Sequence, residues 1–270
     1  MKLISKIHLV SYFIIGLILF SCTKVINIDL KDSTPLYVIE GAVNKGDSVH
    51  IITITQSVLF SATNTFPMVS GASVVISDDA NNSEILTEIA PGKYATAHLL
   101  GIEGRAYTLT VQVGGKVFTS TSTMPQQVNL IMMYFIDDSF GGNGGKIPVP
   151  IRQDPAGIQN NYKFELSVNR HVKSKGWIMD SSIMIQNDDF ADGVITEQPL
   201  FGTIGAFMPQ DSFQVIMTCI DKNVYKYFYS LSLNQQGGAA TPANPVSNIT
   251  GGALGYFSAQ TKQLMKGVVQ

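Results

Sequence analysis

Cysteine is nearly absent from this 270-residue chain, which contains only Cys22 and Cys219. Cys22 ends a hydrophobic leader and is expected to be modified, so Cys219 is left without a partner for an intramolecular disulfide. We therefore expect hydrophobic cores alone to hold the fold, even in an oxidising compartment. In the stretch FQVIMTC, Phe213, Val215 and Met217 share a strand face with Cys219. This pattern predicts a buried, unreactive thiol.

An excess of charge of either sign is also missing. The chain has 18 Lys and Arg against 20 Asp and Glu, and loss of Lys2 and Lys6 with the leader takes the formal net charge from −2 to −4. A mildly acidic chain with scattered lysines has no basic patch for nucleic acid. It also has no basic cluster of the kind that binds anionic lipid surfaces.

Motifs of catalysis and of metal binding are lacking. There is no HExxH, CxxC or GxSxG, and no SxxK follows Cys22. His50, His98 and His171 are too far apart for metal-ligand spacing, which argues against a zinc or iron site. We expect His50 and His98, at the two ends of strands, to be solvated at sheet edges. A triad assembled from distant residues stays open as an alternative.

The glycine-rich stretch GGNGGK, residues 141–146, does not fit a phosphate-binding loop. Such a loop needs glycine where Phe140 stands and Ser or Thr where Ile147 stands. The sequence therefore predicts the tip of a hairpin.

The leader has the pattern of a secretory signal peptide. Lys2 and Lys6 precede the apolar run Leu9–Phe20, and small Ser21 precedes Cys22. The run is shorter than the roughly 20 apolar residues of a membrane-spanning helix. Leu19-Phe20-Ser21-Cys22 resembles the bacterial lipobox, so we expect a lipoprotein signal peptide over 1–21, lipidation (palmitate among the acyl chains) at Cys22 and a tether over 22–34. The alternative is an ordinary signal peptide with a chance cysteine.

Residues 35–125 are predicted to form an immunoglobulin-like β-sandwich. About seven short, roughly alternating segments rich in Val, Ile, Thr and Tyr are separated by turn signals such as NKGD, DDANN and APG. Gly114-Gly115, between TLTVQV and KVFTST, predicts a two-residue hairpin turn with positive φ at both positions.

Residues 126–270 are predicted to form a β-rich (α+β) domain with one helix near 222–236. Pro125 cannot donate to a strand ladder, which places the domain boundary there. Asp221 is positioned to cap the helix, and Val224, Tyr227, Phe228 and Leu231 fall on one of its faces.

The stretch QNDDFADG is the most chemically suggestive in the chain. Asp188, Asp189 and Asp192 place several carboxylates in one turn, which suits calcium. Phe190 and Pro199 occupy positions where an EF-hand needs oxygen ligands, so it is not that motif. A solvated turn, in which Asp side chains bond their own backbone, is the favoured alternative. We expect no cofactor.

Three aromatic residues are candidates for contact with a partner or ligand. Trp177, the sole tryptophan, follows KSKG and is predicted to lie in a loop, where exposure would make it a recognition residue. Tyr225 and Tyr229 are four residues apart on the predicted helix, on a face that does not contain Tyr227 and Phe228. Packing against the second β-sheet is the favoured alternative for this pair.

Several stretches occur in an order that resembles a known family. They are YVIEGAV, VSGASVVISDDANNSEILTE, GKYAT, IEGRAYTLTV, TSTMP, DDFADG, DKNVYKYFYSLSLNQ and NPVSNITGGALGYFSA. Together they resemble the domain-of-unknown-function family 4249, outer-membrane lipoproteins of the Bacteroidota, over roughly residues 22–265. Members are often encoded near TonB-dependent transporters, so the resemblance implies an outer-membrane role in nutrient uptake. It implies no catalytic residues.

We therefore expect a non-catalytic protein anchored in the cell outer membrane through lipid on Cys22. The resemblance makes it an accessory or binding component that works with a TonB-dependent transporter. The alternatives are a structural or adhesive cell-surface module and, third, an enzyme of unknown class. TKVIN follows Cys22 where some surface lipoproteins carry an acidic run, so the periplasmic and surface faces both stay open.

Overall fold

The structure is a computed structural model that describes residues 34–59, 65–139, 145–172, 176–201, 207–235 and 243–270. Residues Pro35–Gln270 form one compact unit. The predicted signal peptide, Cys22 and most of the tether lie outside the described residues. In the described part of the chain, no helix is long and apolar enough to cross a membrane.

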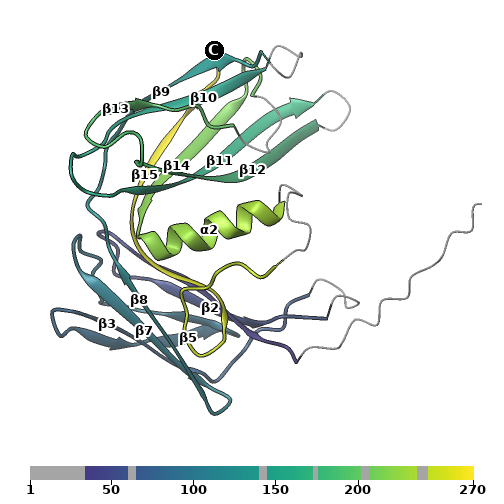
Figure 1. Cartoon of the computed structure of the whole chain (residues 1–270). Helices are drawn as coiled ribbons and strands as arrows, with labels where there is room; N and C mark the ends of the chain where they lie inside the picture. The colour runs from purple at the N-terminus through teal and green to yellow at the C-terminus, as the bar shows by residue number, and fades with distance from the viewer. Residues whose placement is uncertain (1–33, 60–64, 140–144, 173–175, 202–206, 236–242) are drawn as a thin grey trace, which may run out of the picture. The chain divides into compact units, whose positions relative to one another are not determined.

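The predicted fold class is confirmed, because the described residues form a mostly β structure with three sheets and a single helix (Figure 1). The largest sheet contains, in spatial order, β12 (Gly176–Asn187), β11 (Asn161–Val172), β14 (Ser212–Ile220), β15 (Leu254–Val268), β1 (Tyr37–Asn44), β2 (Ile51–Gln56), β6 (Lys93–Ala95) and β5 (Thr87–Ala90). A four-stranded sheet contains β4 (Ser83–Ile85), β3 (Ser73–Asp78), β7 (Ala106–Val113) and β8 (Lys116–Thr123). A three-stranded sheet contains β13 (Ile195–Glu197), β10 (Lys146–Gln153) and β9 (Leu130–Asp137).

The first half of the unit is a β-sandwich. Strands β1, β2 and β6 of the large sheet and β3, β7 and β8 of the four-stranded sheet contribute alternate residues to one core. In β7, for example, Tyr107, Leu109 and Val111 are buried while the residues between them are less so. The turn between β7 and β8 has φ of 56° at Gly114 and 72° at Gly115, so the predicted primed hairpin is confirmed.

Strand β15 belongs to both halves of the large sheet. Its residues Leu254–Gln260 pair in parallel with β1, and Thr261–Val268 pair antiparallel with β14. The predicted domain 126–270 thus contributes a strand to the predicted domain 35–125. The division near residue 125 stays a prediction, but the hydrogen-bonded sheet is continuous across it.

The second half places a core on one face of the large sheet and the helix on the other. Tyr162, Phe164 and Leu166 of β11 pack in a core with Leu130 of β9 and Val215 of β14. Because strand side chains alternate, the residues between them face the opposite way, toward α2 (Lys222–Gln235).

Helix α2 begins where the sequence predicts. Asp221 Oδ1 accepts hydrogen bonds from the backbone N–H groups of Asn223 (2.7 Å) and Val224 (3.0 Å). Its buried face holds Val224, Tyr227 and Phe228, with Leu231 partly buried against them, which confirms the predicted face.

Candidate functional site

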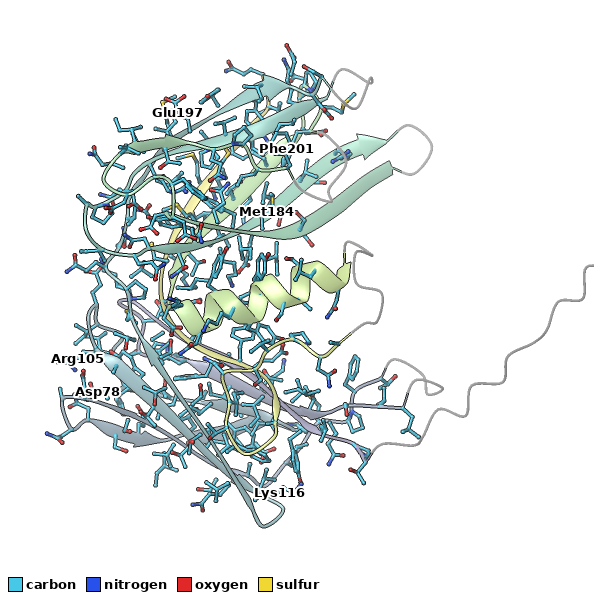
Figure 2. All side chains as sticks on the ribbon, viewed as in Figure 1. Asp78, Arg105, Lys116, Met184, Glu197 and Phe201 are labelled. Atoms are coloured by element: carbon cyan, nitrogen blue, oxygen red, sulfur yellow. The ribbon has the colours of Figure 1, made fainter. Side chains whose placement is uncertain are left out.

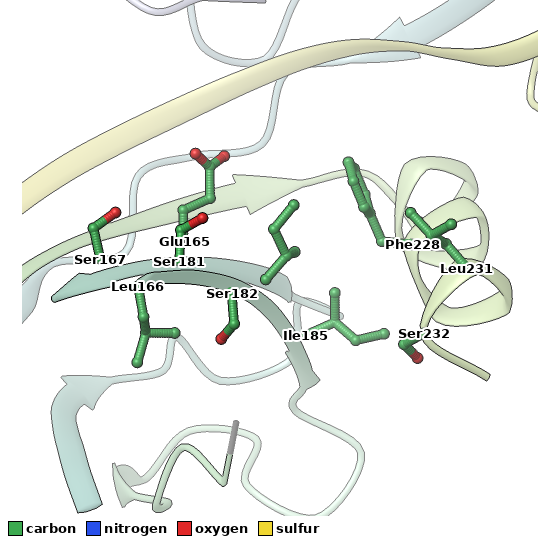
Figure 3. Close-up of a pocket in the computed structure, with 10 residues that line it drawn as sticks. Glu165, Leu166, Ser167, Ser181, Ser182, Ile185, Phe228, Leu231 and Ser232 are labelled. Carbon is green, nitrogen blue, oxygen red and sulfur yellow. The ribbon is translucent and has the colours of Figure 1, made fainter. Parts of the chain in front are cut away.

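A groove lies between α2 and the β11–β12 hairpin (Figure 3). Its volume is about 580 Å³. From the hairpin it is lined by Glu165, Leu166, Ser167, Ser181, Ser182, Ile183 and Ile185, and from the helix by Phe228, Leu231 and Ser232. Among these residues Glu165 is the one ionisable side chain. The groove therefore combines apolar surface with serine hydroxyls, a mixture that suits an amphipathic ligand.

Strand register produces the floor of this groove. Glu165 is directly opposite Ile183, and Ser167 is directly opposite Ser181, so these four side chains share the face that looks toward α2. Lys163 contacts two of the lining residues, because its Nζ lies 2.6 Å from Glu165 Oε1 and 4.8 Å from the centre of the Phe228 ring. The buried lysine thereby ties the hairpin to the helix.

Tyr225 and Tyr229 stack on each other along α2. Their ring centres are 6.1 Å apart, with an angle of 16° between the planes. Tyr229 is 49% exposed, whereas Tyr225 packs against the cluster beneath the helix. Burial raises the pKa of Tyr225, and the neighbouring charge of Asp189 adds to the effect. The ring of Tyr229 is thus available to a partner, whereas the ring of Tyr225 is packed against the protein, as the alternative interpretation predicted.

Trp177 lies in strand β12, where its backbone pairs with His171 of β11, so its predicted loop position is wrong. Strand β12 begins at Gly176, one residue before Trp177. The side chains of Trp177 and His171 lie outside the described residues.

The acidic turn after β12 brings together the carboxylates of two of the three predicted calcium ligands. Asp188 and Asp192 each offer a carboxylate oxygen within 4.8 Å of one another and of an oxygen of Asp154. Asp189 is not in this group; its carboxylate accepts hydrogen bonds from Asn187 Nδ2 (2.6 Å) and Gln159 Nε2 (3.3 Å). Sequence reasoning missed Asp154, which is 34 residues before Asp188, because only the pairing of β10 with β13 brings it there.

Hydrogen bonds hold each carboxylate of this group in place. Asp188 Oδ2 accepts from the backbone N–H of Asn160 (2.7 Å), and Asp192 Oδ1 accepts from that of Gly157 (2.7 Å). Tyr162 Oη donates to Asp154 Oδ1. Burial raises the pKa of Asp154, and the charge of Asp188 raises it further.

A buried arginine lies beside this group. Arg152 is on β10, and its guanidinium carbon lies 4.3 Å from the centre of the Tyr162 ring. Its Nε and Nη1 are buried without a hydrogen-bond partner. Burial lowers the pKa of Arg152. An arginine guanidinium nevertheless keeps its charge in proteins.

The prediction of a solvated edge position is wrong for His50. This residue is 1% exposed, its Nε2 lies 2.8 Å from Leu99 O, and its Nδ1 accepts from Asn44 N at 3.4 Å. The segment that follows β6 covers the start of β2, and this long-range contact is not visible in the local pattern. His98 is exposed, as predicted.

A second hollow, of about 660 Å³, lies beside the β3–β4 hairpin and includes His98. The carboxylates that line it, Asp78 and Glu84, are occupied by ion-pair and hydrogen-bond contacts within the protein. Asp78 is bonded to Arg105 at 2.6 Å, and the two are neighbours in Figure 2. Glu84 accepts backbone N–H bonds from Ala97, His98 and Leu99. Asp78 also accepts hydrogen bonds from the backbone N–H and the side chain of Asn82, both at 2.8 Å. Burial alone would raise the pKa of both carboxyls, but these bonds outweigh it and hold each pKa below its ordinary value.

Cys219 is buried and accepts a hydrogen bond from the backbone N–H of Val128 at 3.4 Å. Burial raises the pKa of its thiol. The predicted buried position in a core is confirmed, and the low reactivity of the thiol stays a prediction.

Comparison with solved structures finds a DUF4785 family protein from Legionella pneumophila, at 12% sequence identity and a TM-score of 0.27. The match covers 71% of this chain and 53% of that one, so the chain spans about half the length of the structure it matches. No curated protein matches significantly. The model of one protein family, the domain of unknown function DUF4249, matches residues 23–264. Because this match covers nearly all of the chain after Cys22, the chain belongs to the DUF4249 family.

Proposed function

We propose that this protein is a non-catalytic binding lipoprotein of the outer membrane, anchored through lipid on Cys22. The leader pattern supports the anchor, and the family match begins at residue 23, immediately after the cysteine. Each buried methylene of an acyl chain contributes roughly 0.8 kcal/mol to membrane binding, so several chains on one residue anchor a protein stably.

The groove between α2 and the β11–β12 hairpin is the observation that carries the binding role. Its volume of about 580 Å³ lies within the roughly 300–1,000 Å³ of small-molecule and peptide pockets. Ile183, Leu231 and Phe228 supply apolar contact, and the serines supply hydrogen bonds without a strong charge. Tyr229, on the same helix, adds a half-exposed aromatic ring of the kind favoured at interfaces.

The partner we propose is a TonB-dependent outer-membrane transporter. This step depends on the family resemblance, because members are often encoded beside such transporters. In this role the groove binds a segment of the transporter or the nutrient that it imports, from either face of the outer membrane.

The test is a pull-down from native membranes in mild detergent, with the lipidated protein tagged at Gln270. We expect a β-barrel transporter to be retained in near-stoichiometric amount. Ser181→Trp, which fills the groove from an exposed strand position, should reduce retention. Thr123→Trp, at an exposed position of β8, is the matched control and should not. Cys22→Ala should leave the membrane fraction.

Recovery of the tagged protein alone would overturn the transporter proposal. Equal loss of retention in both tryptophan variants would show that the groove is not the site that binds the transporter, although the transporter would still be a partner.

A structural or adhesive role is the second candidate, and it is favoured by the edge of the large sheet. Strand β12 is 12 residues long and ends the strand order, and its Met179 is 75% exposed. A long edge strand with exposed apolar side chains can add a strand from another chain. Recovery of copies of this chain alone, abolished by Met179→Lys, would favour this role.

A further inference from the structure

We propose that Asp154, Asp188 and Asp192 bind one calcium ion. The three side chains come from two separate segments. Asp154 directly follows β10, while Asp188 and Asp192 lie in the turn between β12 and β13. One oxygen from each lies within 4.8 Å of an oxygen from the other two, a spacing that a single ion bridges at the roughly 2.3–2.6 Å of calcium–oxygen contacts.

Backbone contacts fix the two segments against each other. Between the segments, Asp154 N donates to Val194 O at 3.1 Å and Gly157 N donates to Asp192 Oδ1 at 2.7 Å. Within the turn, Ala191 N donates to Asp188 O at 2.7 Å. The carboxylates are therefore placed by the fold and do not depend on the chance position of a free side chain.

A buried oxygen without a partner provides an independent indication of a ligand. Asp154 is 2% exposed, and its Oδ2 has no hydrogen-bond partner within normal geometry, although the backbone N–H of Gly193 is near enough to lower the pKa of this carboxyl. A buried polar atom left unsatisfied costs about 1–3 kcal/mol, and more when it is charged. Buried polar atoms in folded proteins usually have a hydrogen-bond partner, so the unpaired Oδ2 of Asp154 requires a cause.

Two more buried acceptors, on strands that pair with neighbours of Asp154, are also without partners. They are Thr196 Oγ1 on β13 and Gln186 Oε1 on β12. Thr196 is directly opposite Arg152, two residues before Asp154, and Gln186 is directly opposite Tyr162, which bonds Asp154. A cation with its bound water would satisfy oxygens of this kind, because water bridges buried polar groups that lack partners.

The charge balance favours a divalent cation. Three ionised carboxylates beside the single guanidinium of Arg152 leave a charge of −2. Arg152 does not remove this charge by direct bonding, since its Nε and Nη1 have no acceptor and its guanidinium lies over the Tyr162 ring. One divalent ion would neutralise the set.

The donor set suits a hard, oxygen-binding divalent ion such as calcium. All three ligands are carboxylates, and neither histidine nor cysteine is in the group, which disfavours zinc. Calcium takes 6–8 oxygens in a flexible arrangement, so water can supply the rest. Asp192 is exposed and Asp154 and Asp188 are buried, so the ion would enter from the solvent side of Asp192.

The experiment uses the full lipidated protein in detergent, freed of metal by chelation. Titration with CaCl₂ in a calorimeter should give one site per chain. Tb³⁺, which replaces Ca²⁺, should show luminescence sensitised through tyrosine, because Tyr162 contacts Asp154 directly. Asp192→Asn, at an exposed position, should weaken calcium binding by at least about tenfold, since ligand charge sets affinity.

Asp154→Asn should weaken binding similarly, and Asp192→Asn keeps the test decisive if that buried variant fails to fold. Asp189→Asn is the matched control, because it removes the same charge beside Asp188 from a residue outside the group. Its affinity should stay within about twofold of the wild type. The proposal is overturned by absence of binding at about 1 mM calcium, the weak end of protein sites. It is also overturned if Asp189→Asn weakens binding as much as Asp192→Asn, which would indicate a diffuse acidic surface.

Discussion

Buried polar side chains determine much of the chemistry of this molecule at the scale of single residues. His50 joins two segments of the sandwich, because its ring contacts both Asn44 N and Leu99 O. Its backbone N–H also donates to Thr96 Oγ1 at 2.8 Å. Since Nδ1 accepts a hydrogen bond, the proton of the neutral ring is on Nε2, which donates to Leu99 O. A second proton on Nδ1 would face the Asn44 N–H and break this arrangement.

We predict that His50 makes the fold less stable in mild acid. Burial lowers the pKa of His50 below its ordinary value of 6.5. Below pH 6.5, His50 therefore binds a proton in the unfolded chain while it stays neutral in the folded chain. Its contribution to stability is therefore complete above pH 6.5 and is lost as the pH falls toward the lowered pKa. Urea unfolding at several pH values between 7.5 and 5 measures the change.

The variants His50→Gln and His98→Gln separate this effect from general acid sensitivity. His50→Gln keeps an N–H donor but cannot titrate, so its stability should fall less between pH 7 and pH 5. His98 is exposed, and its replacement should leave the wild-type dependence intact. Equal pH dependence in the two variants would show that His50 is not the group responsible.

At the scale of elements, local patterns predicted local structure well. The Gly114-Gly115 turn, the Asp221 cap and the buried face of α2 each depend on a few neighbouring residues, and all three are found. The partners of those elements were not predictable in this way. Asp154 joins Asp188 and Asp192 only through strand register, and His50 is buried only because the chain after Tyr94 returns over it.

The segment SNITGGALGYFSA shows why one of the stretches shared with the family has its composition. Asn248 exchanges two hydrogen bonds with the backbone of Phe257, at 2.7 and 3.0 Å. Gly255 has a φ of 94° and is directly opposite Ile39 of β1. A Cβ at Gly255 would lie 2.1 Å from Ile39 O, a backbone atom that cannot move aside without disturbing the ladder. Glycine is thus required where β15 joins β1.

We predict that Gly255→Ala destabilises the fold by about 2–5 kcal/mol, from the left-handed backbone and the clash together. Gly252→Ala is the matched control: its φ is 87°, but a Cβ there meets nothing within 4 Å. That variant should lose only the backbone contribution, about 1–2 kcal/mol. Chemical denaturation of both proteins compares the losses, and equal losses would mean that the approach to Ile39 does not matter.

At the scale of the whole molecule, β15 makes the two halves of the unit depend on each other. The core of the sandwich includes Ile249, Ala253, Phe257 and Ala259 from the end of the chain. Strand β8 adds polar contacts to the same segment, since Ser120 Oγ donates to Asn248 O at 2.9 Å and Ser122 Oγ accepts from Ala259 N at 2.8 Å. The composition and turn signals of residues 35–125 predict strands, but they contain no sign that one strand of the sheet comes more than 120 residues later.

We predict that residues 35–125 do not fold as an isolated fragment. Loss of residues 246–262 would expose β1 as an edge and remove these four buried side chains from the core. Truncation of a buried Phe alone costs about 3–5 kcal/mol, against a typical domain stability of about 5–15 kcal/mol. The whole unit should therefore unfold in one transition, followed by circular dichroism and tyrosine fluorescence together. A chain in which a flexible linker joins residues 35–125 to residues 246–262 restores the missing strand and should recover a cooperative transition. If the isolated fragment already unfolds cooperatively, the sandwich is independent of β15 and the domain boundary predicted near residue 125 is also a boundary of stability.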